Sequence, residues 1–244
     1  MQTPNTLILG GSGSIGSALA RRLIEDGQRV VLAARGEQRL SSVASELGCP
    51  WHACDASDAG AVDSLVKSLA GEGLSGVVCC VGSILLKPAH TTSADEFAET
   101  LRLNLTTAFN AVRSGAAAMT RTGGSIVLLS SAAARTGLAN HEAIAAAKAG
   151  VEGLTRSAAA TYAGRGLRFN AVAPGLVDTP LAERITRSEK ALEHSRRMHP
   201  LGRIGRPDDV ASAIAWLLSE ESDWTTGQVI GIDGGLGRTR AGAS

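Results

Sequence analysis

The sequence predicts a single α/β domain, spanning residues 1–244, in which a doubly wound parallel sheet is flanked by helices. Three observations lead to this fold class. Short apolar runs alternate with longer amphipathic segments along the chain, as in repeated strand–helix–strand units with right-handed crossovers. The short runs lack strict alternation of apolar and polar residues, which is typical of strands covered on both faces. Aromatic residues make up only 3% of the chain and glycines number 29, a composition suited to close packing of helices on a sheet.

The apolar runs set the expected strands, and the amphipathic runs set the expected helices. We expect strands over residues 6–10, 29–34, 50–55, 76–82, 124–131, 167–175 and 227–235. We expect helices over residues 16–27, 37–48, 58–73 and 206–223, and another that begins within residues 140–150. Each expected strand except the last is followed by a helical or charged segment, as a doubly wound sheet requires.

Composition and charge exclude several classes of protein. The formal net charge is +1, so we expect no nucleic-acid partner and no binding to an acidic membrane surface. No apolar run approaches the length that spans a bilayer, and the start of the chain lacks the basic n-region of a signal peptide. The cysteines Cys49, Cys54, Cys79 and Cys80 have no framework spacing, so we expect a cytoplasmic protein with reduced thiols. Cys49, His52 and Cys54 lack the second ligand pair of a zinc site, so no metal is expected.

A glycine-rich turn lies between the first expected strand and the first expected helix. Its glycines Gly11, Gly13 and Gly16 match the G-x-G-x-x-G pattern of dinucleotide-binding proteins. Such glycines permit a tight turn, bring the backbone close to a pyrophosphate and let the helix pack on the strand. The N-terminus of the helix then offers free N–H groups and the positive end of its dipole to the phosphates. We therefore predict a dinucleotide site at this turn.

The end of the second expected strand predicts which dinucleotide is bound. An NAD-binding protein places an acid there for the ribose 2′-hydroxyl. This chain has Arg35 instead, and a guanidinium suits a 2′-phosphate, so we predict NADP(H). The alternative is a surface arginine that only starts the next helix. Asp55, at the end of the third expected strand, can contact the adenine ring or cap the helix that follows.

Motifs along almost the whole chain together resemble the short-chain dehydrogenase/reductase family. They are the glycine loop 10–16, Asp55, Asn104, Ser131, Lys148 and the segments 170–181, 202–219 and 227–235. The resemblance implies a Rossmann-type subunit, usually in a homodimer or homotetramer, with Asn104, Ser131 and Lys148 around the nicotinamide. Pro174, Gly175 and Thr179 would contact its carboxamide end. The residues expected to contact the cofactor are Gly10, Gly11, Ser12, Gly13, Ser14, Ile15, Gly16, Arg35, Asp55, Ala56, Cys80, Val81, Gly82, Asn104, Lys148, Pro174, Gly175, Val177 and Thr179.

Four departures from the family pattern bear on the site. The family's TGxxxGxG would place threonine at Leu9 and glycine at Ser14, so this loop is nearer to a GxxGxxG variant. The usual Asn-Asn-Ala-Gly is replaced by Cys-Cys-Val-Gly over residues 79–82. The basic residue that often precedes the second loop glycine in NADP-dependent members is absent. The family's Tyr-x-x-x-Lys would place the catalytic tyrosine at Ile144, four residues before Lys148.

Isoleucine can neither donate a proton nor ionise, so another group must replace the tyrosine. His141, Ile144 and Lys148 share one helical face because three and four residues separate them. The divergent enoyl-reductase branch of the family uses Tyr-x6-Lys, and its tyrosine would fall at His141. Since histidine ionises near neutral pH, His141 is our candidate proton donor. The alternative is that His141 only begins the helix and faces solvent or a subunit interface.

These residues predict an NADPH-dependent oxidoreductase that transfers hydride to a small or medium ketone, imine or activated alkene. The predicted catalytic residues are Ser131, His141, Lys148 and Asn104: Ser131 reaches the substrate oxygen, and Lys148 with Asn104 holds the ribose and a water path. Two alternatives stay open, a non-redox cyclase, dehydratase or isomerase on the same scaffold, and a nucleotide-binding pseudoenzyme. The charged segment from about 179 to 205 is either a substrate flap or a solvated helical insertion. Its histidines, His194 and His199, can contact substrate if it is a flap.

Overall fold

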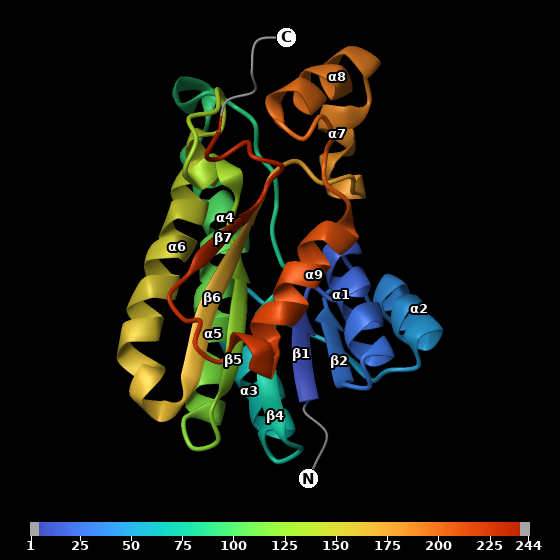
Figure 1. Ribbon diagram of the computed structural model, residues 1–244, viewed down its shortest axis with the longest axis vertical. Helices are drawn as coiled ribbons and strands as arrows, with labels where there is room; N and C mark the ends of the chain where they lie inside the picture. Colours follow the sequence, from blue (N-terminus) through green and yellow to red (C-terminus); the bar gives the residue numbers. More distant parts are fainter. Residues whose placement is uncertain (1–4, 240–244) are drawn as a thin grey trace.

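A parallel sheet of seven strands, in the order β3-β2-β1-β4-β5-β6-β7, forms the middle layer of the protein (Figure 1). The computed structural model describes residues 5–239, so residues 1–4 and 240–244 of the predicted domain lie outside the described part. The strands are β1 (Asn5–Leu9), β2 (Arg29–Ala34), β3 (Trp51–Ala53), β4 (Leu74–Cys79), β5 (Gly124–Leu129), β6 (Leu167–Pro174) and β7 (Val229–Ile232). The helices are α1 (Ser14–Glu25), α2 (Glu37–Leu47), α3 (Ala59–Ala70), α4 (Ala94–Leu101), α5 (Thr107–Met119), α6 (Glu142–Tyr162), α7 (Glu183–Thr186), α8 (Glu189–Met198) and α9 (Pro207–Leu218).

Each predicted strand is present, and the predicted fold class is confirmed. The third strand differs most from its prediction, since it is confined to Trp51–Ala53 and its residues are exposed. It lies at the edge of the sheet, paired only with β2 among the described strands. The apolar run predicted a strand buried on both faces, but burial at an edge depends on which neighbours the fold supplies.

Helices cover both faces of the sheet because successive residues of a strand point to opposite sides. Leu7 belongs to a core shared with α3, α5 and α6. Ile8, the next residue, belongs to a second core shared with α1, α2 and α9. In Figure 1, α5 and α6 lie on one side of the strands and α1 and α9 on the other. The central strands are therefore covered on both faces, as their uninterrupted apolar runs predict.

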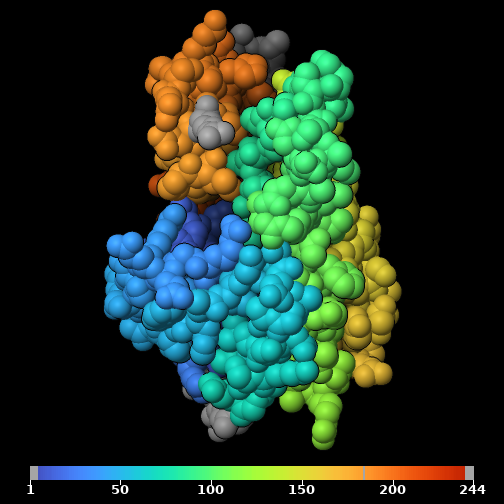
Figure 2. Space-filling view, turned by 180° about the vertical axis from the view of Figure 1, so that it is seen from behind, coloured from blue at the N-terminus to red at the C-terminus, as the bar shows by residue number. Residues whose placement is uncertain are grey.

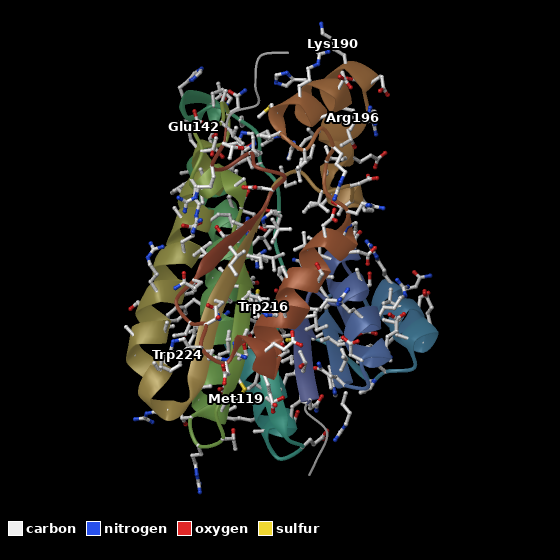
Figure 3. The ribbon with its side chains drawn as sticks, viewed as in Figure 1. Met119, Glu142, Lys190, Arg196, Trp216 and Trp224 are labelled. Atoms are coloured by element: carbon white, nitrogen blue, oxygen red, sulfur yellow. The ribbon has the colours of Figure 1, made fainter. Side chains whose placement is uncertain are left out.

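The carboxyl ends of the strands collect the loops that carry the predicted site residues. Strand order reverses between β1 and β4, and the crevice outside such a reversal is where open α/β sheets bind ligands. The segment 179–205, which contains α7 and α8, extends beyond these strand ends (Figure 1). Arg196 of α8 and Glu142, the first residue of α6, lie at this same end of the molecule (Figure 3).

The described residues contain neither a helix able to cross a membrane nor a cluster placed to hold a metal ion. Within residues 5–239, no helix combines the length and the apolar composition needed to cross a membrane. The same residues hold no group of three or more His, Cys, Asp or Glu side chains placed to bind a metal ion.

Candidate active site

The glycine turn after β1 lines a groove with a volume of about 370 Å3. Seen from behind in Figure 2, a hollow lies between the blue N-terminal part of the chain and the orange segment that contains α7 and α8. A Cβ at Gly16 would lie 2.5 Å from the carbonyl oxygen of Gly10, so only glycine lets α1 start this close to the turn. Gly10 has φ +81°, a conformation that side chains disfavour.

The structure separates the four glycines of the turn into two roles. Gly10, Gly13 and Gly16 line the groove, in agreement with the GxxGxxG variant. Gly11 does not line it: a Cβ there would lie 2.8 Å from Leu32, so this glycine lets β1 and β2 pack closely. The other predicted cofactor residues that line the groove are Ser12, Ser14, Ile15, Arg35, Asp55, Ala56, Cys80, Val81, Gly82 and Thr179.

The far end of the groove carries two arginines where one was predicted. Arg35, directly after β2, and Arg39, in the first turns of α2, both line it. Arg39 was missed, although its position four residues after Arg35 on a predicted helix was available from the sequence. Two guanidinium groups at one end of the groove create a local site for an anion.

Asp55 lies between two arginines at this end. Its carboxylate is 4.0 Å from the guanidinium groups of both Arg35 and Arg102, and it accepts hydrogen bonds from the Ser57 N–H and hydroxyl. Burial raises the pKa of Asp55, but the Ser57 bonds and the two arginines outweigh burial and lower it overall. The predicted capping role is wrong, because Asp58 caps α3 through the N–H groups of Gly60 and Ala61.

The groove leads into a smaller cavity of about 160 Å3, which we call the inner pocket. The two spaces share lining residues from the glycine turn, the loop after β4 and the segment after β6, and are therefore continuous. The inner pocket is where the structure brings together most of the residues predicted near the nicotinamide. They are Asn104, Ser131, Lys148, Pro174, Gly175, Val177 and Thr179.

Asn104 lies in a π-helical turn, Arg102–Thr106, between α4 and α5. Such turns insert an extra residue into a helix and occur often at functional sites. The Asn104 side chain donates to the Thr100 carbonyl and the Ser83 hydroxyl, and its oxygen accepts from the Ser83 N–H. Asn104 therefore fixes the loop after β4 against the inner pocket.

Lys148 brings a buried ammonium group to the inner pocket. The residue is 7% exposed, and its Nζ donates to the Leu129 carbonyl at 2.8 Å, at the end of β5. Burial lowers its pKa from 10.5 to about 8. A lysine retained only for solubility would not be buried in this way.

Ile144 is buried and lines the inner pocket together with Lys148 and Ser131. Ile144 and Ser131 also line an adjoining cavity of about 110 Å3, which we call the side pocket. The Ser131 hydroxyl oxygen accepts from the Ala133 N–H, which leaves its proton free to donate.

His141 lines the side pocket and is also the N-cap residue of α6. Its Nδ1 lies 2.7 Å from the Ala139 carbonyl oxygen, so Nδ1 carries the proton of the neutral ring. Nε2 is then the ring nitrogen left to interact with a ligand in the side pocket.

The two histidines of the segment 179–205 differ from each other. His194 is exposed on α8. His199 is buried, and both of its ring nitrogens are bonded to backbone groups of the protein. Neither lines the inner pocket or the side pocket.

Comparisons with known proteins agree with this arrangement. The model of the family described as "Enoyl-(Acyl carrier protein) reductase" matches residues 10–237. Cis-4-hydroxycyclohexanecarboxylate dehydrogenase of Sinomonas cyclohexanicum is 35% identical over 237 residues, covering 94% of each chain. The 3-oxoacyl-[acyl-carrier-protein] reductase FabG of Thermotoga maritima is 35% identical over 247 residues, covering 94% of this chain and 96% of that protein.

Solved structures resemble the fold over nearly its whole length. A short-chain type dehydrogenase/reductase from Mycobacterium ulcerans superposes with a TM-score of 0.93 at 30% identity, covering 99% of this chain and 92% of that one. An actinorhodin polyketide ketoreductase with NADPH superposes with a TM-score of 0.92 at 27% identity, covering 97% and 98%. The chain belongs to the short-chain dehydrogenase/reductase family, and its general activity is NAD(P)-dependent oxidoreduction.

Replacing Lys148 with methionine should stabilise the protein at neutral pH, because the buried ammonium has a pKa lowered to about 8. Below that pH the folded and unfolded chains both carry the charge, and the folded chain bears its full desolvation cost. Above pH 10.5, the ordinary pKa of a lysine side chain, Lys148 is neutral in both the folded and the unfolded chain. The desolvation cost of the charge is then absent. The gain should be about 3 kcal/mol at most near pH 7 and should shrink as pH rises from about 8 to 10.5.

Urea unfolding of Lys148→Met and the wild type across this pH range checks the prediction. Lys67→Met is the control, since Lys67 is largely exposed on α3. A gain for Lys148→Met that does not change with pH would contradict it.

Proposed function

We propose that this protein is an NADPH-dependent reductase of an apolar ketone, imine or activated alkene, with His141 as proton donor. The observation that carries the proposal is the set of residues that line the two pockets. Ser131, Ile144 and Lys148 line the inner pocket, and His141 lines the adjoining side pocket. When bound, the reduced nicotinamide supplies the hydride.

The residues of the groove and inner pocket fit such a cofactor. The N-terminus of α1 suits a pyrophosphate, because it offers free N–H groups and because Gly16 has no side chain to block a close approach to the backbone. A Cβ at Gly82 would lie 3.0 Å from Asn104 Oδ1 and 3.6 Å from Lys148 Nζ, so this glycine keeps a side chain away from both polar groups. In the proposal these two groups hold the ribose.

Ser131 and His141 then act on the substrate oxygen or nitrogen as negative charge develops there. The Ser131 hydroxyl donates a hydrogen bond. The imidazolium form of His141 donates the Nε2 proton, and the ring keeps its Nδ1–H on the Ala139 carbonyl throughout. That carbonyl thus fixes the ring's orientation and tautomer.

The walls of the two pockets support an apolar, uncharged substrate. Ile84, Ile144, Leu176 and Leu236 line the side pocket, and Leu181, after β6, lines the inner pocket. Among the described residues, the linings of both pockets contain no carboxylate and no guanidinium group. An ionised substrate group would therefore find no counter-charge beyond Lys148 and His141. Because Thr179, Leu181 and Ala182, near the start of the segment 179–205, line the inner pocket, we propose that this segment is the substrate flap.

The proposed function is tested by measuring NADPH oxidation with purified protein against matched cyclic ketones, enones and imines. We expect turnover with at least one class. Conversion of a substrate without NADPH consumption would replace the proposal with a non-redox isomerase or dehydratase. Tight NADPH binding without any conversion would indicate a pseudoenzyme.

His141→Ala should lower kcat on the preferred substrate by about a hundredfold or more, the usual effect of losing a positioned acid. The affinity for NADPH should not change, because His141 does not line the groove. Glu142→Ala is the matched control, since Glu142 is the next residue, is exposed and lines neither pocket. Full activity in His141→Ala would show that the proton comes from another group.

The preference for NADPH over NADH is proposed from Arg35 and Arg39. Arg35 is more than half exposed, and its nearest acid, Asp55, is engaged by Ser57, so the guanidinium is accessible to a ligand anion. Arg39 lines the same end of the groove. Together the two arginines fit the 2′-phosphate of NADPH. The 2′-hydroxyl of NADH would lack the acidic partner that NAD-binding proteins place at this position.

Arg35→Ala and Arg39→Ala should each weaken NADPH binding by about tenfold or more, the worth of a charge-assisted hydrogen bond. NADH binding should change little in either variant. Fluorescence titration with each cofactor measures both effects. Arg29→Ala is the control, because Arg29 is similarly exposed but lies at the opposite end of β2. Equal losses for NADPH and NADH would contradict the assignment.

We also propose that two or four copies of the chain associate through the β7 side of the sheet. Trp224 is 98% exposed and Trp216, on α9, is 38% exposed; Figure 3 labels both. β7 is the last strand of the sheet, and its outer backbone groups pair with no other described strand. Exposed indoles beside an open sheet edge are typical of an interface between subunits.

Light scattering should find the wild type as a homodimer or homotetramer, and Trp224→Lys should shift it toward smaller species. Trp51→Lys is the matched control, because Trp51 is a partly exposed tryptophan on β3, at the opposite edge. An unchanged mass for Trp224→Lys would place the interface elsewhere.

We propose the cytoplasm as the site of action. The four cysteines are free in the structure, as expected where glutathione keeps thiols reduced.

A further inference from the structure

His199, the residue after α8, connects two segments that the sequence keeps far apart. It is 3% exposed. Its Nδ1 lies 2.7 Å from the carbonyl oxygen of Ser195, in the last turn of α8. Its Nε2 lies 3.1 Å from the backbone N–H of Leu176, just after β6. Both contacts are hydrogen bonds only when the ring is neutral with its proton on Nδ1, so each contact has a fixed direction.

Each backbone group that His199 binds lies at the end of a regular element. Ser195 O belongs to the last turn of α8, where helix carbonyls lack intrahelical partners. Leu176 lies beyond β6, after Gly175 has made a last backbone bond to Ile232 of β7. The imidazole therefore supplies the partners that the helix and the sheet do not.

The ring also lies directly against the backbone of Gly175. A Cβ at Gly175 would lie 2.5 Å from Nε2 and 3.0 Å from Cδ2 of His199, so only glycine allows this approach. Gly175 and Leu176 line the inner pocket and the side pocket. On their other side they line, together with His199, a cavity of about 410 Å3. The two residues thus form a thin wall, with the pockets on one side and the imidazole on the other.

We propose that His199 is a positioning residue that holds the Gly175–Leu176 wall of the inner pocket and couples it to α8 of the flap. It does not contact substrate, because both ring nitrogens are used by the protein. Without its bond the Leu176 amide is released, and the wall can move away from the reacting carbon. The kinetic part of this inference rests on the proposed reductase function, whereas the structural part does not.

Two amide variants separate the two bonds of the ring. Glutamine places its carbonyl oxygen near the position of Nε2, so His199→Gln can still accept from Leu176. Asparagine places its NH2 group near the position of Nδ1, so His199→Asn can still donate to Ser195 but leaves Leu176 without an acceptor. Each variant loses one hydrogen bond, so their melting temperatures should fall similarly. His194→Asn is the control on the exposed face of the same helix.

Hydrogen exchange of the peptide that contains Leu176 is measured in the full-length protein. We expect exchange about tenfold faster in His199→Asn and nearly unchanged in His199→Gln. For the substrate identified above, kcat should fall about tenfold in His199→Asn only, because hydride transfer is sensitive to alignment. NADPH affinity should change less than threefold in both variants, because the groove holds most of the cofactor.

Equal exchange rates in His199→Asn and His199→Gln would overturn the inference. So would equal losses of kcat in the two variants, since kcat would then follow the loss of stability and not the loss of the Leu176 hydrogen bond. Loss of cooperative unfolding in His199→Asn alone would also count against it, since the ring would then support the whole fold. If no substrate is reduced, the exchange measurement still decides whether His199 holds the Leu176 amide. Failure of the proposed reductase function is therefore distinguishable from failure of this inference.

Discussion

The close approach of α1 to the end of β1 is the contact on which the rest of the site depends. Gly16 lies so near the Gly10 carbonyl that no side chain fits between them, and a Cβ at Gly10 itself would lie 2.9 Å from the Cys80 carbonyl carbon. These two contacts bring the N-terminus of α1 and the loop after β4 to one point. Because all strands are parallel, the segments after β5 and β6 end at the same edge and close the inner pocket around it.

Lys148 shows that this pocket is not arranged for stability alone. An ammonium group is costly to bury, and this one has a carbonyl as its hydrogen-bond acceptor and shares its pocket with the isoleucine Ile144. No ion pair of Lys148 occurs among the described side chains. Natural proteins keep such destabilising groups mainly where activity requires them. A buried cation in the same pocket as Ser131 therefore supports the proposed active site.

His141 and His199 differ in how many of their ring nitrogens are hydrogen-bonded to the backbone. His141 has one nitrogen on a carbonyl and the other available to the side pocket, as a proton donor needs. His199 has both nitrogens engaged and is suited to holding backbone in place. In the two proposals the same residue type thus serves chemistry in one place and geometry in the other. The difference comes from the backbone groups around each ring.

The sequence by itself determined the sheet, the helices α1, α2, α3, α6 and α9, and most of the groove, because these follow from short-range patterns. Apolar runs located each strand, and the spacing of the glycines together with Lys148 located the cofactor end of the site. Local spacing also placed Ile144 and His141 on one helical face, since a helix repeats every 3.6 residues. The family motifs then supplied Asn104 and the residues after β6.

Only the tertiary structure decided how distant segments meet. Trp51–Ala53 is exposed because β3 lies at an edge, which its apolar sequence does not encode. Gly11 packs against Leu32 instead of lining the groove, because β2 passes behind the turn. His199 reaches Leu176 across 23 residues of sequence through a hydrogen bond that no repeat or motif predicts. Local periodicity places a residue on a face of its own element, but its partners depend on how the elements pack.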